Sequence, residues 1–263
     1  ESPYIPKLKY LSENHMQMLT LQVTQQCNFR CSYCPYTLGD DYTQRSHSSK
    51  QMSWETAKAA IDFWAERITH SNKVDIGFYG GEPLLEWPLI KKCIEYAKMR
   101  TEGKEVTFSM TTNATLLTRE IAETIVKERM QVLNSLDGPP EIHDRNRRFH
   151  ADGRGTFSTI METLQKMSEE VEGFAETLRF NSVIDPCNSP ACISNFFKEI
   201  KQENVTPSNL EPPPGTRLSY SKQYMREFNR SDFYGYLSLM GIVRDDQLDM
   251  FSNNFVRNYS SKR

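Results

Sequence analysis

The sequence predicts an α/β fold with a parallel sheet and helices packed outside it. Segments with the pattern of a strand and segments with the pattern of a helix alternate five times along the first 210 residues. Each of the first strand-like segments runs into a loop rich in cysteine, glycine or polar residues. Such alternation implies parallel strands joined by helical crossovers. We therefore expect the reactive groups in the loops that follow the carboxyl ends of the strands.

The strands are predicted from the alternation of apolar and polar residues. This period of two is clear in residues 18–24, and residues 74–79 lead directly into two glycines. The strands are expected at 18–24, 74–79, 105–112, 130–136 and 178–184, with a sixth near 204–210.

The helices are predicted from their apolar spacing and their capping residues. Ser53 has the character of an N-cap, and apolar residues follow it at helical spacing. The helices are expected at about 53–68, 88–101, 118–127, 156–172 and 189–202.

The chain is expected to have three parts. Residues 1–15 form an N-terminal arm and 16–210 a core domain. Residues 211–263 form a helical extension, or a linker toward a domain that this chain lacks, because Pro212 to Gly215 interrupt regular structure. The chain begins at Glu1 and not at a methionine, which is consistent with a truncated sequence.

The composition excludes several classes of protein. The net charge is −2 and the pI is about 6.3, which argues against general binding to nucleic acid or to a membrane surface. No apolar stretch approaches the ~20 residues of a membrane span. The six cysteines are too few for a small secreted disulfide scaffold. We therefore predict a cytoplasmic protein.

Three of the cysteines form the motif CxxxCxxC in the loop after the first strand: Cys27, Cys31 and Cys34. Thiolates are the natural ligands of iron–sulfur clusters. Three thiolates leave one iron of a [4Fe–4S] cluster open, and an open iron can chelate an amine and a carboxylate. A zinc site is the main alternative and needs a fourth ligand, for which His47 is the nearest downstream candidate. Three incidental cysteines are the remaining interpretation.

Further motifs follow the other strands. Residues 79–83 are Tyr-Gly-Gly-Glu-Pro, 111–114 are Thr-Thr-Asn-Ala, and 135–139 are Ser-Leu-Asp-Gly-Pro, followed by His143, Asp144 and Arg147. With the cysteines, these motifs resemble the radical S-adenosylmethionine (SAM) superfamily over roughly residues 16–205. They are most similar to the subgroup that modifies peptides and proteins, whose members often carry an auxiliary SPASM domain. The resemblance implies a partial (β/α)6 TIM-like barrel.

The resemblance also implies roles for individual residues. The cluster ligands would be Cys27, Cys31 and Cys34, and the SAM-binding residues Tyr33, Gly80, Gly81, Glu82, Asn113, Ser135 and Arg147. Tyr33 would lie beside the adenine, the Gly-Gly-Glu segment would receive the amino group, and Arg147 would pair with the carboxylate. Alternatives remain: a plain tight turn at the two glycines, a solvated Arg147, and an Asn113 that only closes its strand.

The implied activity is the reductive cleavage of SAM to a 5′-deoxyadenosyl radical that takes hydrogen from a ribosomally made peptide. The opening of the cysteine motif is closest to maturases of Cys-rich peptides, which favours a thioether crosslink. The alternatives are an epimerase, a formylglycine-forming sulfatase maturase, and a non-catalytic metal-binding protein on the same fold. The implied partners are a precursor peptide and an electron donor such as ferredoxin or flavodoxin.

One feature departs from the subgroup. No cysteine follows Cys192, so either the sequence is truncated and auxiliary iron–sulfur clusters belong to a part that it does not contain, or the enzyme works with one cluster. Cys187 and Cys192 follow the fifth strand and could supply a thiol or a ligand, although small loop residues are the more ordinary interpretation. Cys93 is expected to pack within a helix.

Overall fold

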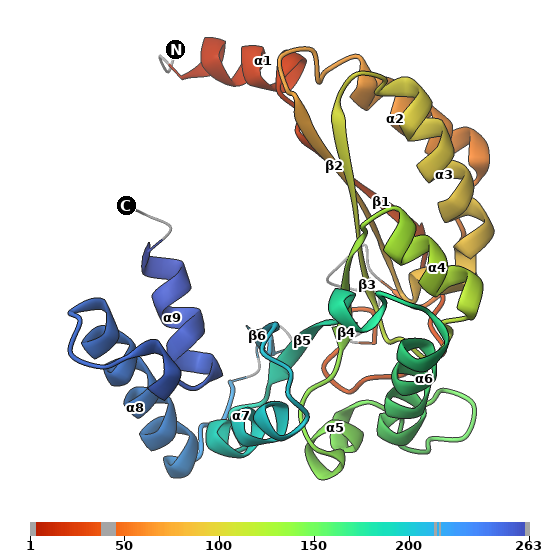
Figure 1. Cartoon of the computed structure of the whole chain (residues 1–263). Coiled ribbons are helices and arrows are strands. Elements are labelled where there is room, and N and C mark those ends of the chain that lie inside the picture. Colours follow the sequence, from red (N-terminus) through yellow and green to blue (C-terminus); the bar gives the residue numbers. More distant parts are fainter. Residues whose placement is uncertain (1–3, 38–45, 213–214, 216, 261–263) are drawn as a thin grey trace. The chain divides into compact units, whose positions relative to one another are not determined.

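The computed structural model describes residues 4–37, 46–212, 215 and 217–260, and it shows the predicted α/β class (Figure 1). Among these residues, six strands follow one another in a sheet in sequence order. The pairs β1–β2, β2–β3 and β5–β6 are parallel. The strands are β1 (Met18–Thr24), β2 (Lys73–Gly80), β3 (Glu105–Thr112), β4 (Gln131–Ser135), β5 (Arg179–Ile184) and β6 (Val205–Asn209).

The helices alternate with the strands, as the sequence predicts. They are α1 (Ile5–Asn14), α2 (Trp54–Ala65), α3 (Trp87–Arg100), α4 (Arg119–Lys127), α5 (Pro140–Asn146), α6 (Phe157–Glu170), α7 (Pro190–Glu199), α8 (Lys222–Leu239) and α9 (Met250–Ser260). Short 3₁₀ turns are η1 (Pro83–Glu86), η2 (Ala175–Thr177) and η3 (Asp245–Gln247).

Side-chain caps fix where several helices begin. The hydroxyl of Ser53 accepts the backbone N–H of Thr56, which confirms the predicted N-cap of α2. Ser189 and Ser221 cap α7 and α8 in the same manner. Each cap satisfies a backbone donor that the first helical turn leaves without a partner.

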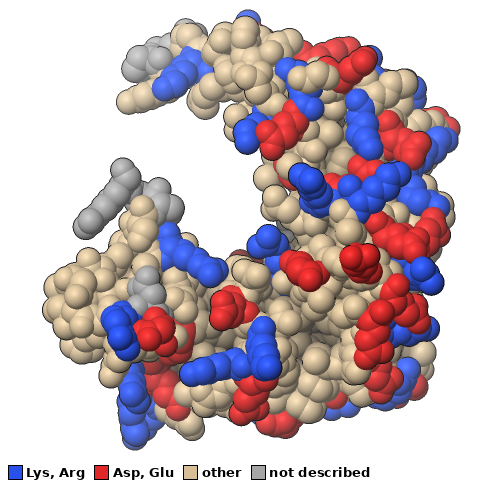
Figure 2. All heavy atoms as spheres, in the orientation of Figure 1, with Lys and Arg blue, Asp and Glu red and all other residues tan. Residues whose placement is uncertain are grey.

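The chain divides into two compact units, and the boundary passes through β4. The first unit comprises residues 1–28, 45–133 and 162–177. Its strands β1–β3 are covered by α2, α3 and α4 (Figure 1), and the rings of Phe78 and Phe108 stack between neighbouring strands. Acidic and basic side chains are intermixed over these helices (Figure 2), and the ion pair between Lys98 and Glu128 joins two of them.

The second unit comprises residues 29–44, 134–161 and 178–263. Phe180 of β5 packs against Phe197 of α7 with ring centroids 5.8 Å apart. β6 is the last strand of the sheet, and it contains Pro207. Proline has no backbone N–H to donate, so it suits a strand at the edge of a sheet.

Three segments differ from the expectation or add to it. The arm contains α1, a helix without a buried residue. The C-terminal part contains the helices α8 and α9, and two of the prolines at 212–214 lie outside the described residues. The short helix α5 was not predicted. In the part that the structure describes, no helix is long and apolar enough to cross a membrane.

Candidate functional site

Gly80, the last residue of β2, and Gly81 lie too close to the backbone of the cysteine loop to carry a side chain. A Cβ atom on Gly81 would lie 2.1 Å from the carbonyl oxygen of Gln26, and one on Gly80 would lie 2.4 Å from that of Thr24. The same backbones are hydrogen-bonded, because Gly81 N–H donates to Thr24 at 3.0 Å and Glu82 N–H donates to Gln26 at 2.8 Å. The Gly-Gly-Glu segment therefore holds the start of the cysteine loop, up to the residue before Cys27, by backbone hydrogen bonds and close packing.

Glu82 is buried and its carboxylate joins the ends of β2 and β3. Its side chain is 1% exposed. Oε1 accepts the hydroxyl of Thr112 at 2.7 Å and the N–H of Leu84 at 3.0 Å, and Oε2 accepts the N–H of Asn113 at 2.8 Å. Burial raises the pKa of Glu82, while these donors act in the opposite direction. A carboxylate offers about four acceptor positions, so this network leaves about one on Oε2.

Asn113 connects the end of β3 to the cysteine loop. Its Nδ2 donates to Oδ1 of Asn28 at 2.8 Å, and its Oδ1 accepts both the N–H and the hydroxyl of Thr115. Asn28 in turn donates to the Thr115 hydroxyl at 3.0 Å. Asn28 follows Cys27 directly, so the residues on both sides of this cysteine are held to the sheet. The prediction for Asn113 was SAM binding or the closing of its strand; the structure shows a hydrogen-bonded link between the cysteine loop and the end of β3.

In the second unit, Arg147 and Asp137 form a buried ion pair. Arg147 Nε and Nη2 each lie 3.0 Å from an oxygen of Asp137, and both side chains are below 10% exposed. Asp137 also accepts the hydroxyl of Tyr33 at 2.5 Å and the backbone N–H of Val183 in β5 at 3.0 Å. Burial acts to lower the pKa of Arg147, but Asp137 holds it well above its usual range. The solvated interpretation of Arg147 is therefore wrong.

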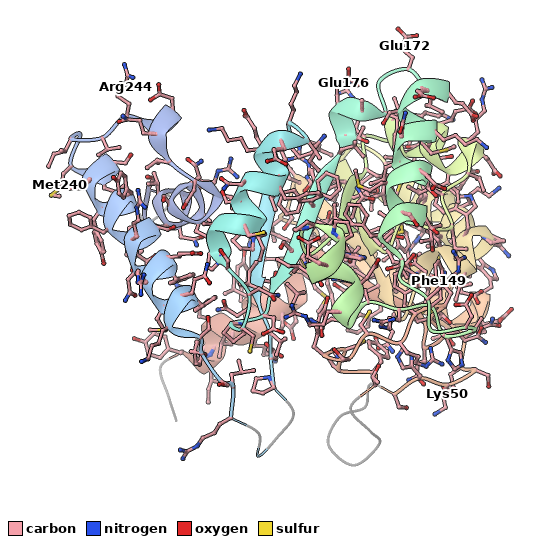
Figure 3. All side chains as sticks on the ribbon, turned by 90° about the horizontal axis from the view of Figure 1, so that it is seen from below. Lys50, Phe149, Glu172, Glu176, Met240 and Arg244 are labelled. Carbon is pink, nitrogen blue, oxygen red and sulfur yellow. The ribbon has the colours of Figure 1, made fainter. Side chains whose placement is uncertain are left out.

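This ion pair adjoins the later part of the cysteine loop. Cys34 N–H donates to the carbonyl of Cys31 at 3.1 Å, so the two thiols lie on one tight turn. Burial raises the pKa of Cys31 to about 11, and the charge of Arg147 acts to lower it. The loop is also fastened before this turn, where Phe29 forms an antiparallel bridge and a ring contact with Phe149, which is labelled in Figure 3.

His143 is a buried side chain that the sequence placed in a motif but to which it gave no role. Its Nδ1 accepts the backbone N–H of Asp137 at 3.2 Å, and its Nε2 lies 2.9 Å from the hydroxyl of Thr156. Since a backbone N–H can only donate, Nδ1 must be unprotonated, and the proton of the neutral ring is on Nε2. Burial, with the charge of Arg147, lowers the pKa of His143 to about 4.

Ser135, Tyr33 and the three cysteines are the remaining predicted site residues. Ser135 is buried at the last position of β4, and Tyr33 precedes Cys34. None of the three cysteines of the motif forms a disulfide in the described part of the chain; Cys31 is buried, and Cys27 and Cys34 are half-buried. The described residues contain no group of three or more His, Cys, Asp or Glu side chains placed to hold a metal ion. The three-thiolate site therefore stays a prediction.

The site residues that sequence reasoning missed are those that hold others in place. Asp137 and Thr112 lie at the carboxyl ends of β4 and β3, and Asn28 lies inside the cysteine motif. Their position in the sequence could have identified them, because polar side chains that follow the carboxyl ends of parallel strands are often found in functional sites.

Comparison with known proteins agrees with these features. The family model described as the radical SAM superfamily matches residues 21–179, which is more than half of the chain. The chain therefore belongs to the radical SAM superfamily. The cofactors of this family are a [4Fe–4S] cluster and SAM, as the sequence predicts. Free thiols are the right donors for such a cluster.

Several curated relatives are named for an activity. The chain is 27% identical over 226 residues to the radical SAM cyclopropyl synthase TigE of Paramaledivibacter caminithermalis, a match that covers 82% of this chain and 44% of TigE. It is 32% identical over 179 residues to the serine-type anaerobic sulfatase-maturating enzyme of Bacteroides thetaiotaomicron, covering 66% of this chain and 41% of that protein. The chain thus spans less than half the length of either relative.

A solved structure confirms the fold. Native anSMEcpe with bound AdoMet and Cp18Cys peptide has a TM-score of 0.68 to this chain at 22% sequence identity. The match covers 86% of this chain and 61% of that one. The predicted fold class, the partial TIM-like barrel of radical SAM enzymes, is confirmed.

Proposed function

We propose that this chain is the catalytic core of a radical SAM enzyme that modifies a peptide. The observation that carries the proposal is the anchoring of the CxxxCxxC loop. Its first part is held by Glu82, Gly81 and Asn113, and its last part by the Tyr33–Asp137 contact. A non-catalytic metal-binding protein would not require a buried arginine and a buried glutamate, each held by several hydrogen bonds, in addition to the thiols.

Cys27, Cys31 and Cys34 would hold the cluster, and the predicted residues around Gly80–Glu82, Ser135 and Arg147 would hold SAM. When bound, this pair of cofactors supplies reductive cleavage of SAM and a radical that abstracts hydrogen. The protein supplies binding, orientation and exclusion of water. Arg147, which already pairs with Asp137 through Nε and Nη2, would pair with the carboxylate of SAM, because a planar guanidinium suits a carboxylate.

Glu82 would act mainly as a positioning residue. Three neutral donors already hold its carboxylate, and only about one acceptor position on Oε2 is left for the ammonium group of SAM. Its hydrogen bonds set the path of the backbone that follows Gly81. We therefore expect Glu82→Gln to weaken SAM binding and the protein's stability together.

The peptide substrate is inferred from the relatives. The Bacteroides relative matures sulfatases by its name, and the neighbouring solved structure contains a peptide. Thioether formation remains our first choice on the resemblance of the cysteine motif, and the Bacteroides relative supports the formylglycine alternative. We further propose an electron donor of the ferredoxin or flavodoxin type and a cytoplasmic location. The core domain would comprise residues 16–210.

The test is anaerobic reconstitution with iron and sulfide, followed by addition of SAM and dithionite. The expected results are about four irons per chain and formation of 5′-deoxyadenosine. Cys31→Ala should abolish both, and Cys187→Ala, an exposed thiol outside the motif, should abolish neither. Uptake of one zinc ion without iron would overturn the proposal. With a peptide substrate, mass spectrometry separates a crosslink, an epimer and an aldehyde.

A further inference from the structure

The second unit contains a cavity of about 300 Å³ at the carboxyl ends of β5 and β6. Ile184 and Asn209, the last residues of these strands, form its floor, and side chains of α8 and α9 form its walls. These two helices lie side by side (Figures 1 and 3). In α/β proteins, ligands bind beyond the carboxyl ends of the strands, and this volume is at the lower end of the range for small-ligand pockets.

One wall of the cavity carries a carboxylate. Asp232 of α8 lines it, and within the part of the chain that the structure describes this carboxylate has no hydrogen-bond or ion-pair partner. Burial and then the nearby charge of Asp249 raise the pKa of Asp232. Asp249, by contrast, is held by the hydroxyls of Ser231 and Ser252. A half-buried carboxylate without a cation gains most from a positively charged ligand.

The other walls are aromatic. Phe228, Phe255 and Tyr259 line the cavity, and the rings of Phe255 and Tyr259 lie 4.5 Å apart. Phe228 is stacked on Tyr224 with an interplanar angle of 13°, which fixes its orientation. Aromatic faces attract ammonium and guanidinium groups, and the attraction grows when the cation is desolvated.

Side-chain amides complete the lining. Asn209 and Asn254 both reach the cavity, and among the described residues neither side chain has a hydrogen-bond partner. An amide offers both donors and an acceptor, as does a peptide backbone. The lining therefore combines a carboxylate, aromatic rings and two amides, which is a set suited to a cation carried on a peptide.

We propose that this cavity binds the cationic side chain of a basic residue in the peptide substrate, with Asp232 as its ion-pair partner. The inference rests on the proposed peptide-modifying function. It adds a specificity element: a lysine or arginine near the modified residue. Asp232 is a recognition residue and has no part in the chemistry.

The experiment uses the full chain and two probes, Nα-acetyl-lysine N-methylamide and Nα-acetyl-norleucine N-methylamide. They differ in the terminal group, which is an ammonium in lysine and a methyl in norleucine. Ligand-observed NMR titrations give the affinity of each probe without cluster or SAM. The lysine probe should bind at least about tenfold more tightly, since a hydrogen bond to a charged group contributes that much or more.

Variants locate the site. Asp232→Asn should weaken the lysine probe about tenfold, and Tyr259→Leu, at a ring that is 49% exposed, about two- to fivefold. Glu211→Gln, an exposed carboxylate outside the cavity, should leave the affinity unchanged. Equal binding of the two probes, or no loss in both Asp232→Asn and Tyr259→Leu, overturns the proposal. Because the readout needs no turnover, failure of the enzymatic proposal is seen separately, as the absence of 5′-deoxyadenosine.

Discussion

The Asp137–Arg147 pair offers the sharpest test of how the candidate site is held together. The change is Asp137→Asn, which keeps the shape of the side chain and the acceptor for Val183 N–H but removes the negative charge. Arg147 is 8% exposed at its side chain and keeps its positive charge. The variant therefore leaves a buried cation without its counter-ion.

The expected loss of unfolding free energy is about 3–5 kcal/mol, the usual cost of removing one partner of a buried ion pair. The matched control is Asp152→Asn, which breaks the Asp152–Arg154 pair at 3.1 Å in the same unit. Those side chains are 54% and 59% exposed, so this loss should stay below about 1 kcal/mol. Burial alone separates the two expectations.

The assay is urea unfolding of the cluster-free chain followed by far-UV circular dichroism. A double variant, Asp137→Asn with Arg147→Met, should be more stable than Asp137→Asn alone, because the unpaired charge is gone. The reasoning is refuted when Asp137→Asn costs no more than Asp152→Asn, or when the double variant is the less stable of the two.

Three further predictions concern neighbouring residues. The pKa of His143 in the folded state is about 4, below its ordinary 6.5, so the free energy of unfolding should fall by roughly 2–4 kcal/mol as the pH drops from about 6.5 toward 4. In urea unfolding at each pH, His143→Gln should lack this loss. The control His150→Gln, at an exposed histidine, should retain it. Gly81→Ala should lower the free energy of unfolding by about 3 kcal/mol, because the added Cβ would lie 2.1 Å from a backbone oxygen. Gly77→Ala should lower it by less than about 1 kcal/mol, because the added Cβ would lie 3.3 Å from a side-chain hydroxyl. Similar thermal-melt curves for the two variants would contradict this. Glu82→Gln should lower the free energy of unfolding by about 1–3 kcal/mol, because an amide facing three donors leaves at least one of them without an acceptor. A chemical-denaturation midpoint equal to that of the natural chain would disprove this.

Local signals were sufficient to predict most of the sheet and its helices. The alternation over 18–24 and 105–112 predicted β1 and β3 with the observed bounds. Ser53 marked the start of α2 correctly, because an N-cap acts on the backbone two or three residues away. The short helix α5 escaped prediction, since its N-cap position is Pro139, it has no side-chain cap and it spans seven residues.

The network around Arg147 could not be derived from local patterns. Tyr33 and Asp137 are 104 residues apart in the chain, and only the folded sheet edge brings them together. The sequence also offers three similar arginines at 145, 147 and 148. Arg145 donates to Asn188 and Arg148 to the carbonyl of Gly153, whereas Arg147 alone of the three is buried. Burial decides between them, and it is a property of the fold.

The backbone hydrogen bonds between the Gly-Gly-Glu segment and the start of the cysteine loop suggest an order for folding and cluster assembly. The carbonyl groups of Thr24 and Gln26 accept backbone N–H groups of Gly81 and Glu82, so the main chain that leads into Cys27 is positioned when the sheet folds, before any iron is bound. Amide hydrogens of Gly81 and Glu82 should then exchange slowly even in the iron-free chain. Assembly of the iron–sulfur cluster would then begin from a partly ordered site. The conformational entropy of this stretch of backbone would be lost during folding and not during cluster assembly.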